Sequence, residues 1–201
     1  NIYKALIWLD KSPIFLIDCQ PLQHEIRGIG RYGVNLVNTI IENNKEYKIF
    51  LFINNFLEKK LLTRIKLNNK ASFIECCFDD IEHPEYYERN VYYTDKEEIH
   101  EQTLASFIDA INPFIYLNLS EFDRRKVSLN KSLLKNKHIK TYCILHDLIP
   151  IKTNSYKYSN IPKWSSNYNK QLNNCKTYTN MLSNSLFTFK DCKDILDNIK
   201  H

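Results

Sequence analysis

The stretch PIFLID, residues 13–18, is a run of apolar residues that ends in an aspartate. The consecutive apolar residues 14–17 are typical of a strand buried on both faces, as strands are in a parallel sheet. Similar short runs recur along the chain, and between them lie longer stretches whose apolar residues follow the helical period. The strands predicted in this way are at 13–18, 47–53, 71–78, 113–119, 141–145 and 186–189. The predicted helices are at 31–44, 56–67, 96–111, 162–182 and 190–200.

Apolar strands that alternate with helices are the pattern of an α/β domain. We therefore predict a doubly wound, mainly parallel sheet with helices on both faces. The chain contains no internal repeat and no linker that divides it. We expect one domain over residues 14–201, preceded by a leading segment or linker over residues 1–13. Because the first residue is Asn rather than Met, we expect the chain to be an excerpt or a processed product.

The composition excludes several classes of protein. Hydrophobic residues make up 43% of the 201 residues, too many for a disordered chain, and only three residues are glycine. No apolar run approaches the ~18 residues of a membrane span, and residues 1–10 do not have the pattern of a signal peptide. The net charge of +5 is mild and forms no basic stripe, so we expect no nucleic-acid partner. This charge favours weak association with an anionic membrane surface.

The six cysteines contain no C-x-x-C pair, and four of them lie in or beside apolar strand-like runs. This pattern is typical of reduced, mostly buried thiols rather than of a disulfide framework or a zinc site. Reduced thiols indicate a cytoplasmic location, with peripheral contact at the inner face of the membrane as an option.

All three glycines of the chain lie within the segment GIGRYG, residues 28–33, between the first predicted strand and the first predicted helix. One explanation is a tight loop with positive φ angles. A second is close approach of a ligand to main-chain N–H groups at a helix N-terminus. A turn without a ligand is the alternative. In a doubly wound sheet this segment lies at the carboxyl edge, where ligands bind.

The same letters satisfy the dinucleotide pattern G-x-G-x-x-G, but their surroundings do not. Nine residues separate Asp18 from Gly28, whereas the dinucleotide glycines follow their strand directly. The pattern also requires an acidic residue ~20 positions later, where this chain has Asn54 and Asn55. A nicotinamide or flavin enzyme is therefore a minor alternative.

Two polar stretches follow later strands. His146 and Asp147 come directly after the apolar run 141–145, and Pro150 turns the chain away. A histidine at this position can donate to a sugar hydroxyl or a developing oxyanion, with the aspartate orienting it, and a hydrogen-bonded structural role is the alternative. We expect His146 and the glycine segment to face one cleft at the same edge of the sheet. In the stretch 182–191 we expect Ser185 and Thr188 to cap the last helix.

These stretches, in this order, resemble the N-terminal half of family 4 glycosyltransferases of the GT-B fold. The matching letters are FLID at 15–18, PL at 21–22, GIGRY at 28–32, LHDLIP at 145–150 and SLFTFKD at 185–191. The LHDLIP stretch is similar to that of mannosyltransferase-like members. The resemblance covers residues 14 to about 199, and it implies a Rossmann-like acceptor-side domain.

The resemblance implies a retaining, metal-independent hexosyltransferase that moves a sugar from a nucleotide donor to an acceptor hydroxyl. The donor would be a GDP- or UDP-sugar and the acceptor a glycan or lipid-linked saccharide, in polysaccharide biosynthesis. No cofactor and no metal site are implied, and the chain contains no D-x-D motif. The implied catalytic residues are His146 and Asp147. The implied substrate-binding residues are Gly28, Ile29, Gly30, Arg31, Tyr32 and Asp18.

The sequence departs from this family in two ways. Cys19 and Gln20 stand where the family usually has a basic residue before Pro-Leu. The donor-binding C-terminal domain of the family has no counterpart within these 201 residues. We therefore expect a partner domain in the same or another chain, and little or no activity from this chain alone. The alternative is a non-catalytic binding or assembly module with the same fold.

Three weaker signals have ordinary explanations. The basic helix predicted at 56–67 would lie on anionic lipid or cover the sheet with a solvated face. The acidic residues 79–83 have the types of metal ligands, but we expect only a solvated loop. The basic cluster 124–126 is either surface charge or a contact for an anionic substrate.

Overall fold

The computed structural model describes residues 12–23, 28–54, 62–76, 94–122, 133, 135–146, 148 and 171–198. The predictions for the leading segment, the acidic loop 79–83, the basic cluster 124–126, Asp147 and most of the helix 162–182 lie outside these residues.

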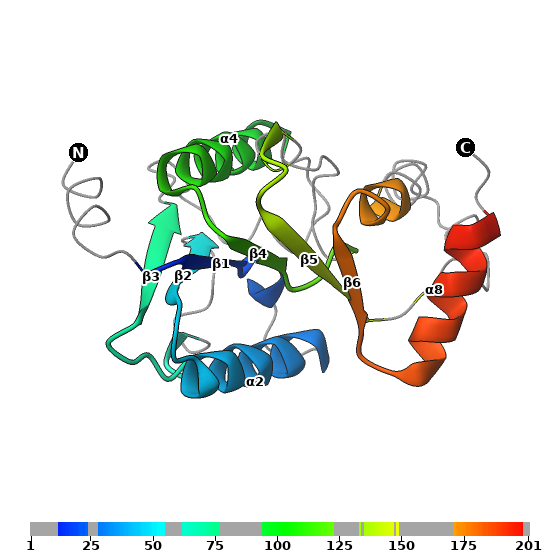
Figure 1. The fold of residues 1–201 in the computed structure, drawn as a ribbon, viewed down its shortest axis with the longest axis horizontal. Coiled ribbons are helices and arrows are strands. Elements are labelled where there is room, and N and C mark those ends of the chain that lie inside the picture. The colour runs from blue at the N-terminus through cyan, green and yellow to red at the C-terminus, as the bar shows by residue number, and fades with distance from the viewer. Residues whose placement is uncertain are drawn as a thin grey trace.

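A sheet of six parallel strands forms the centre of the domain (Figure 1). Its strands are β1 (Ile14–Asp18), β2 (Lys48–Asn54), β3 (Ala71–Cys76), β4 (Ile115–Asn118), β5 (Lys140–Leu145) and β6 (Asn180–Ser183). The strand order is β3-β2-β1-β4-β5-β6, so the direction of winding reverses between β1 and β4. This order is that of Rossmann-like sheets, and it confirms the predicted α/β fold.

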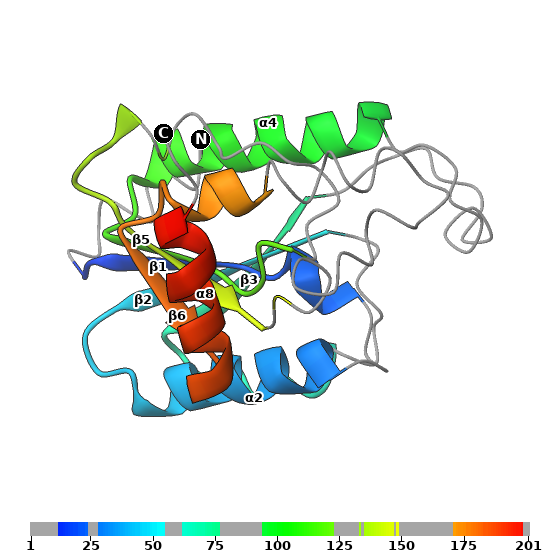
Figure 2. The same ribbon diagram turned by 90° about the vertical axis from the view of Figure 1, so that its right-hand side faces the viewer.

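Helices cover both faces of the sheet. The longer helices are α2 (Gly28–Asn43), α4 (Thr94–Ile111) and α8 (Leu186–Asn198), and a short 3-10 helix, η1 (Gln20–Gln23), follows β1. In Figures 1 and 2, α4 lies on one face, α2 on the other, and α8 beside the edge strand β6. Helix α4 ends at Ile111 because Asn112 adopts a left-handed φ of 48° and Pro113 follows it.

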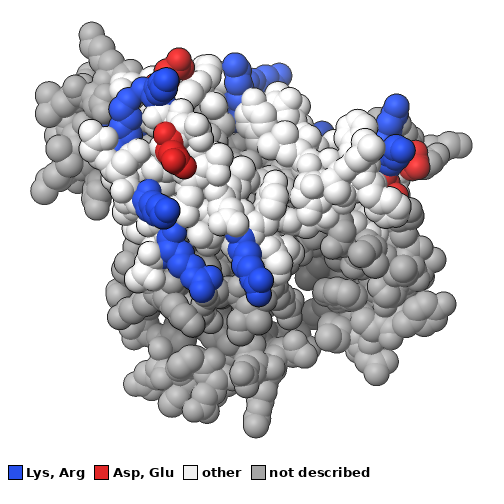
Figure 3. All heavy atoms as spheres, turned by 90° about the horizontal axis from the view of Figure 1, so that it is seen from below, with Lys and Arg blue, Asp and Glu red and all other residues white. Residues whose placement is uncertain are grey.

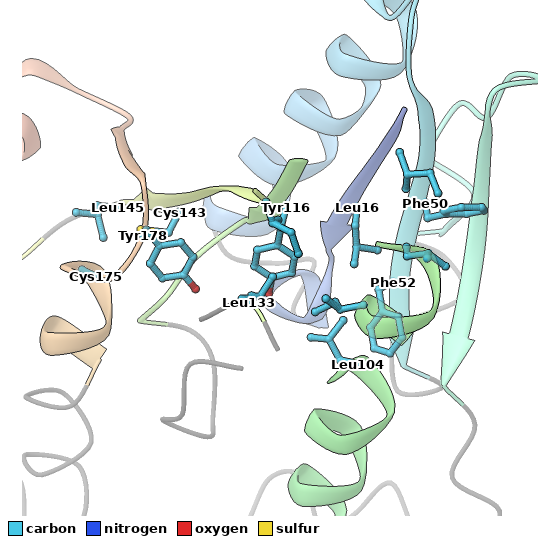
Figure 4. Close-up of a cluster of buried hydrophobic side chains, with 14 of the residues drawn as sticks. Leu16, Phe50, Phe52, Leu104, Tyr116, Leu133, Cys143, Leu145, Cys175 and Tyr178 are labelled. Carbon is cyan, nitrogen blue, oxygen red and sulfur yellow. The ribbon is translucent and has the colours of Figure 1, made fainter. Parts of the chain in front are cut away.

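Two hydrophobic clusters fill the space between the sheet and its helices. Strand β1 contributes Leu16 to the cluster under α4 and Ile17 to the cluster under α2. Strand β2 alternates in the same way, and its Phe50 and Phe52 lie with Leu104 of α4 in the cluster shown in Figure 4. Successive side chains of a strand point to opposite faces, and here both faces are covered. This is why the strands are continuous apolar runs.

The prediction for residues 180–189 is wrong. Residues 180–182, expected at the end of the helix 162–182, belong to β6 (Asn180–Ser183), and residues 186–189, expected as a strand, begin α8. The reason is the cap that was expected of Ser185, whose Oγ accepts the backbone N–H of Thr188 at 3.0 Å. Thr188, Asp191 and Cys192 then form a buried face at helical spacing. The predicted cap at Ser185 is confirmed, whereas Thr188 lies inside the helix.

Two other helix boundaries also differ from the prediction. Helix α2 begins at Gly28, so the glycine segment forms its first turns and not a preceding loop. Residues 63–67, the end of the helix expected at 56–67, are turn and coil, which corrects that part of the prediction.

Gly33 is required by the packing of α2 against η1. A Cβ atom at Gly33 would lie 2.3 Å from Cδ2 of Leu22, which is fully buried, and 3.6 Å from Cδ1 of Leu119. Gly28, in contrast, is exposed and has nothing within 4 Å of its Cβ position. The small size of Gly33 is therefore explained by the core.

We predict that Gly33→Val lowers the free energy of unfolding by about 2–3 kcal/mol, because Leu22 cannot move without disturbing the core. The matched variant Gly28→Val changes it by no more than about 0.5 kcal/mol. Urea denaturation of both variants measures the difference. In a Leu22→Ala background Gly33→Val should cost less, and equal effects of the two glycine variants would contradict the packing argument.

Candidate functional site

The candidate site lies at the carboxyl edge of the sheet, beside the point where the winding reverses. Asp18 ends β1, and its register partner Asn118 ends β4. His146 follows β5 directly. In sheets whose winding reverses in this way, ligands bind at the carboxyl edge beside the point of reversal.

Tyr32 and His146 connect the glycine segment to the later strand. Their rings meet edge to face, with centroids 5.2 Å apart and planes at 90°. Tyr32 is 38% exposed, whereas His146 is only 9% exposed. The structure thus brings together two residues that are 114 positions apart in the sequence (146 − 32).

His146 is held by two further hydrogen bonds. Its Nε2 lies 3.0 Å from the backbone oxygen of Leu119, which follows β4. Its own backbone oxygen accepts a hydrogen bond of 3.0 Å from the Thr188 hydroxyl on α8. Ring and main chain are therefore fixed by different elements of the fold.

The first turns of α2 provide donors for an anion. The first four N–H groups of a helix have no partner inside it, and the helix dipole makes this end positive. The first turn contains no acidic residue, and Arg31 is exposed beside it. Among the described residues visible from the side of α2, Lys and Arg outnumber Asp and Glu, but most of them lie away from this end of the helix (Figure 3). This end of α2 is suited to a phosphate group.

The glycines make different contributions to this end of α2. None of the three, all of them in the described part of the chain, has a positive φ, so the tight-loop explanation is wrong. Gly30 is buried and Ile29 is half-buried. Gly28 is exposed with open space around it. The explanation that a ligand approaches the main chain closely therefore still applies to Gly28.

Asp18 is fully buried and cannot contact a substrate in this arrangement. Its Oδ2 accepts a hydrogen bond of 3.0 Å from the hydroxyl of Tyr116 on β4. Asp18 therefore ties β1 to β4 at the reversal point and supports the site from behind.

A second polar cluster at this edge was missed by sequence reasoning. Glu121 is fully buried, and its carboxylate accepts hydrogen bonds from Asn118 at 2.7 Å, Tyr178 at 2.6 Å and Asn174 at 3.0 Å. Within the described residues no Lys or Arg pairs with it. The available signal was its position just after a predicted strand, but its partners at 174 and 178 are distant in sequence.

The described cysteines are reduced and buried, as predicted. Cys19, Cys143, Cys175 and Cys192 are free thiols. Burial raises the pKa of Cys19 well above its usual value, and it raises the pKa of Cys192 to about 12. Thiols with raised pKa values are poor nucleophiles, so Cys19 and Cys192 are suited to packing and not to nucleophilic chemistry.

Other kinds of site are not found in the described part of the chain. No group of three or more His, Cys, Asp or Glu side chains there is arranged to hold a metal ion. None of the helices described has the length and apolar character needed to cross a membrane. Comparisons with protein-family models and with curated proteins give no match to this sequence.

We predict that Tyr178→Phe lowers the free energy of unfolding by about 1.5–3 kcal/mol, because Glu121 loses a short hydrogen bond to its charge. Tyr47→Phe is the control, since within the described residues the Tyr47 side chain makes only ring contacts. Thermal or urea unfolding measures both. A Tyr178→Phe protein as stable as the control would show that Glu121 does not depend on this bond.

Proposed function

We propose that this chain forms the acceptor-side half of a retaining, metal-independent glycosyltransferase of the GT-B fold. It would move a hexose, with mannose favoured by the motif resemblance, from a nucleotide sugar to the hydroxyl of a glycan or lipid-linked saccharide. The observation that carries this proposal is the edge contact between Tyr32 and His146. It joins the GIGRY and LHDLIP stretches at the ligand-binding edge of a parallel sheet.

The two residues in this contact belong to segments that would bind different parts of the donor. The start of α2, with Arg31, faces the diphosphate of the donor, and His146 faces a sugar hydroxyl. In the transfer, the bond from the sugar C1 to the phosphate oxygen breaks and a bond to the acceptor oxygen forms. The acceptor proton leaves with the diphosphate, so no metal and no cofactor is required.

The buried carboxylates support transfer on one face of the sugar. Retention by double displacement needs a carboxylate that can reach the sugar. Asp18 and Glu121 are both fully buried and hydrogen-bonded, so neither can act as that nucleophile. As far as these two described carboxylates are concerned, direct delivery of the acceptor hydroxyl from the side of the departing diphosphate is the reaction that agrees with this arrangement.

An exposed apolar flank supports the presence of a second lobe. Leu186, Phe187 and Phe189 at the start of α8 are 69%, 66% and 56% exposed, and Met181 and Leu182 of β6 are also exposed. Apolar surface of this extent normally meets a partner. We propose that a donor-binding domain, in the same or another chain, covers this flank.

The flank also favours the second candidate function, a non-catalytic assembly module. For the enzyme we propose a cytoplasmic location, with peripheral contact at the inner membrane face.

We predict that His146→Ala, in protein that includes the donor-binding lobe, lowers turnover by about 100-fold or more, because the sugar loses its hydrogen-bond partner. His138→Ala is the matched control, since His138 lies at the opposite end of β5 and bonds Asn112. The assay measures release of nucleoside diphosphate from GDP- and UDP-sugars with glycan acceptors. Equal activity of the two variants would contradict the role of His146.

We further predict that this chain alone catalyses little or no transfer, because half of the donor site lies on the other lobe. Isolated chain and two-lobed protein are assayed side by side with the same donors. Measurable turnover by the chain alone would overturn the division into two lobes. Absence of turnover with every donor in the two-lobed protein would favour the assembly module.

A further inference from the structure

The hydrogen-bond partner of the His146 Nε2 atom determines which ring nitrogen carries the proton. Nε2 lies 3.0 Å from the main-chain oxygen of Leu119, and a carbonyl oxygen can only accept a hydrogen bond. Nε2 must therefore carry a hydrogen. A neutral imidazole carries one N–H, so Nδ1 is left with a lone pair and acts as an acceptor.

Nothing in the described part of the chain occupies Nδ1. The contacts of the ring there are the bond at Nε2 and the edge contact with Tyr32. His146 is 9% exposed, so little of the ring is open to solvent, and Tyr32, which lies against it, is 38% exposed.

The Leu119 oxygen is held in place by a turn whose side chains close on Glu121. Oδ1 of Asn118 accepts the backbone N–H of Ser120 at 3.1 Å, which closes the turn around Leu119. Nδ2 of the same side chain donates to Glu121 at 2.7 Å. The Leu119 side chain is buried and lies against the position of Gly33 on α2. The orientation of the carbonyl is thus determined on both sides.

Burial of the Glu121 carboxylate costs free energy of desolvation. A carboxylate removed from water without a cation must be compensated by donors, and here Asn118, Asn174 and Tyr178 supply them. An apolar residue would fill this space at lower cost, but the Asn118 amide would lose its shorter hydrogen bond, to Glu121, and keep the one of 3.0 Å to the Tyr178 hydroxyl. The benefit of this arrangement is the fixed turn.

We propose that Glu121 is a positioning residue: through Asn118 and the Leu119 carbonyl, it fixes His146 in the Nε2–H tautomer and presents Nδ1 to the ligand as an acceptor. The group that binds Nδ1 is then a hydrogen-bond donor and not a phosphate oxygen, because phosphate oxygens of the donor only accept; in the proposed substrate that group is a hydroxyl of the sugar. The ligand part of this inference rests on the proposed function. The tautomer and the role of Glu121 do not.

The test is nuclear magnetic resonance of the chain labelled with 15N-histidine, at a pH where the ring is neutral. Long-range 1H–15N correlations are expected to show a protonated Nε2 and an unprotonated Nδ1 for His146, assigned by loss of the signals in His146→Gln. An Nδ1–H tautomer in the unaltered chain would overturn the proposal, whether or not any ligand binds.

Two tyrosine variants test the role of Glu121. Tyr178→Phe removes a donor to Glu121 together with an acceptor of the Asn118 amide, and Tyr116→Phe removes a donor to Asp18 on the neighbouring strand. We expect Tyr178→Phe, and also Glu121→Gln, to lose the single-tautomer signature while Tyr116→Phe keeps it. Backbone 1H–15N spectra identify variants that fold. A His146 tautomer unchanged in folded Tyr178→Phe and Glu121→Gln would overturn the positioning role.

Ligand titration tests the hydroxyl, in the two-lobed protein that the proposed function requires. GDP-mannose and UDP-glucose are compared with GDP and UDP, which lack the sugar. We expect Nδ1 to shift with a nucleotide sugar and not with the nucleotide alone. A shift with GDP or UDP alone, whose hydroxyls are those of the ribose, would overturn the assignment of a hydroxyl of the transferred sugar to Nδ1. If neither sugar nucleotide binds, the proposed function fails while the tautomer result stands by itself.

Discussion

Parallel pairing of β1 with both β2 and β4 is the constraint on which the rest of the domain depends. Parallel strands need crossovers that return along the faces of the sheet, and these crossovers bring α2 to one face and α4 to the other. The same pairing aligns Asp18 with Asn118 at the carboxyl edge. Everything polar in the candidate site follows from that alignment, because the later strands extend the same edge.

Polar groups at this edge are buried in pairs rather than exposed singly. Asp18 bonds Tyr116 on the neighbouring strand β4, whereas Glu121 bonds the Asn118 amide at the end of its own strand and the hydroxyl of the distant Tyr178. These bonds add specificity more than stability, since each carboxylate loses its water. The result is a rigid floor beneath His146 and the first turns of α2, the parts of this edge that we propose contact a ligand. Rigidity of this kind is what positions a histidine for recognition.

The sequence was sufficient to predict the sheet because buried parallel strands are recorded directly as apolar runs. Strands β1, β2 and β5 were predicted to within one or two residues for that reason. The short edge strand β6 was missed because it is exposed, and its NMLS letters have no apolar run. The letters of α8 have strong strand propensity, but the Ser185 cap and the buried face at Thr188 prevail.

In the candidate site, too, only the features that depend on local sequence could be predicted. His146 and the glycine segment were recognisable because each follows a strand end, and their contact follows from sheet topology. Glu121 was not recognisable, because its function depends on Tyr178, which is 57 positions away and joined to it only by folding. The size limit at Gly33 was also hidden, since it arises from Leu22 on a different element.

The flank and the site are connected through a single side chain. Thr188 lies on the buried face of α8 and donates to the backbone oxygen of His146, while Phe187 and Phe189 on either side of it are exposed. A lobe that covers these phenylalanines would press on the same turn of helix that holds the main chain of His146. The edge of the sheet and its open flank are thus parts of one arrangement. Burial of the flank would restrict the one histidine that the rest of the edge already keeps in place.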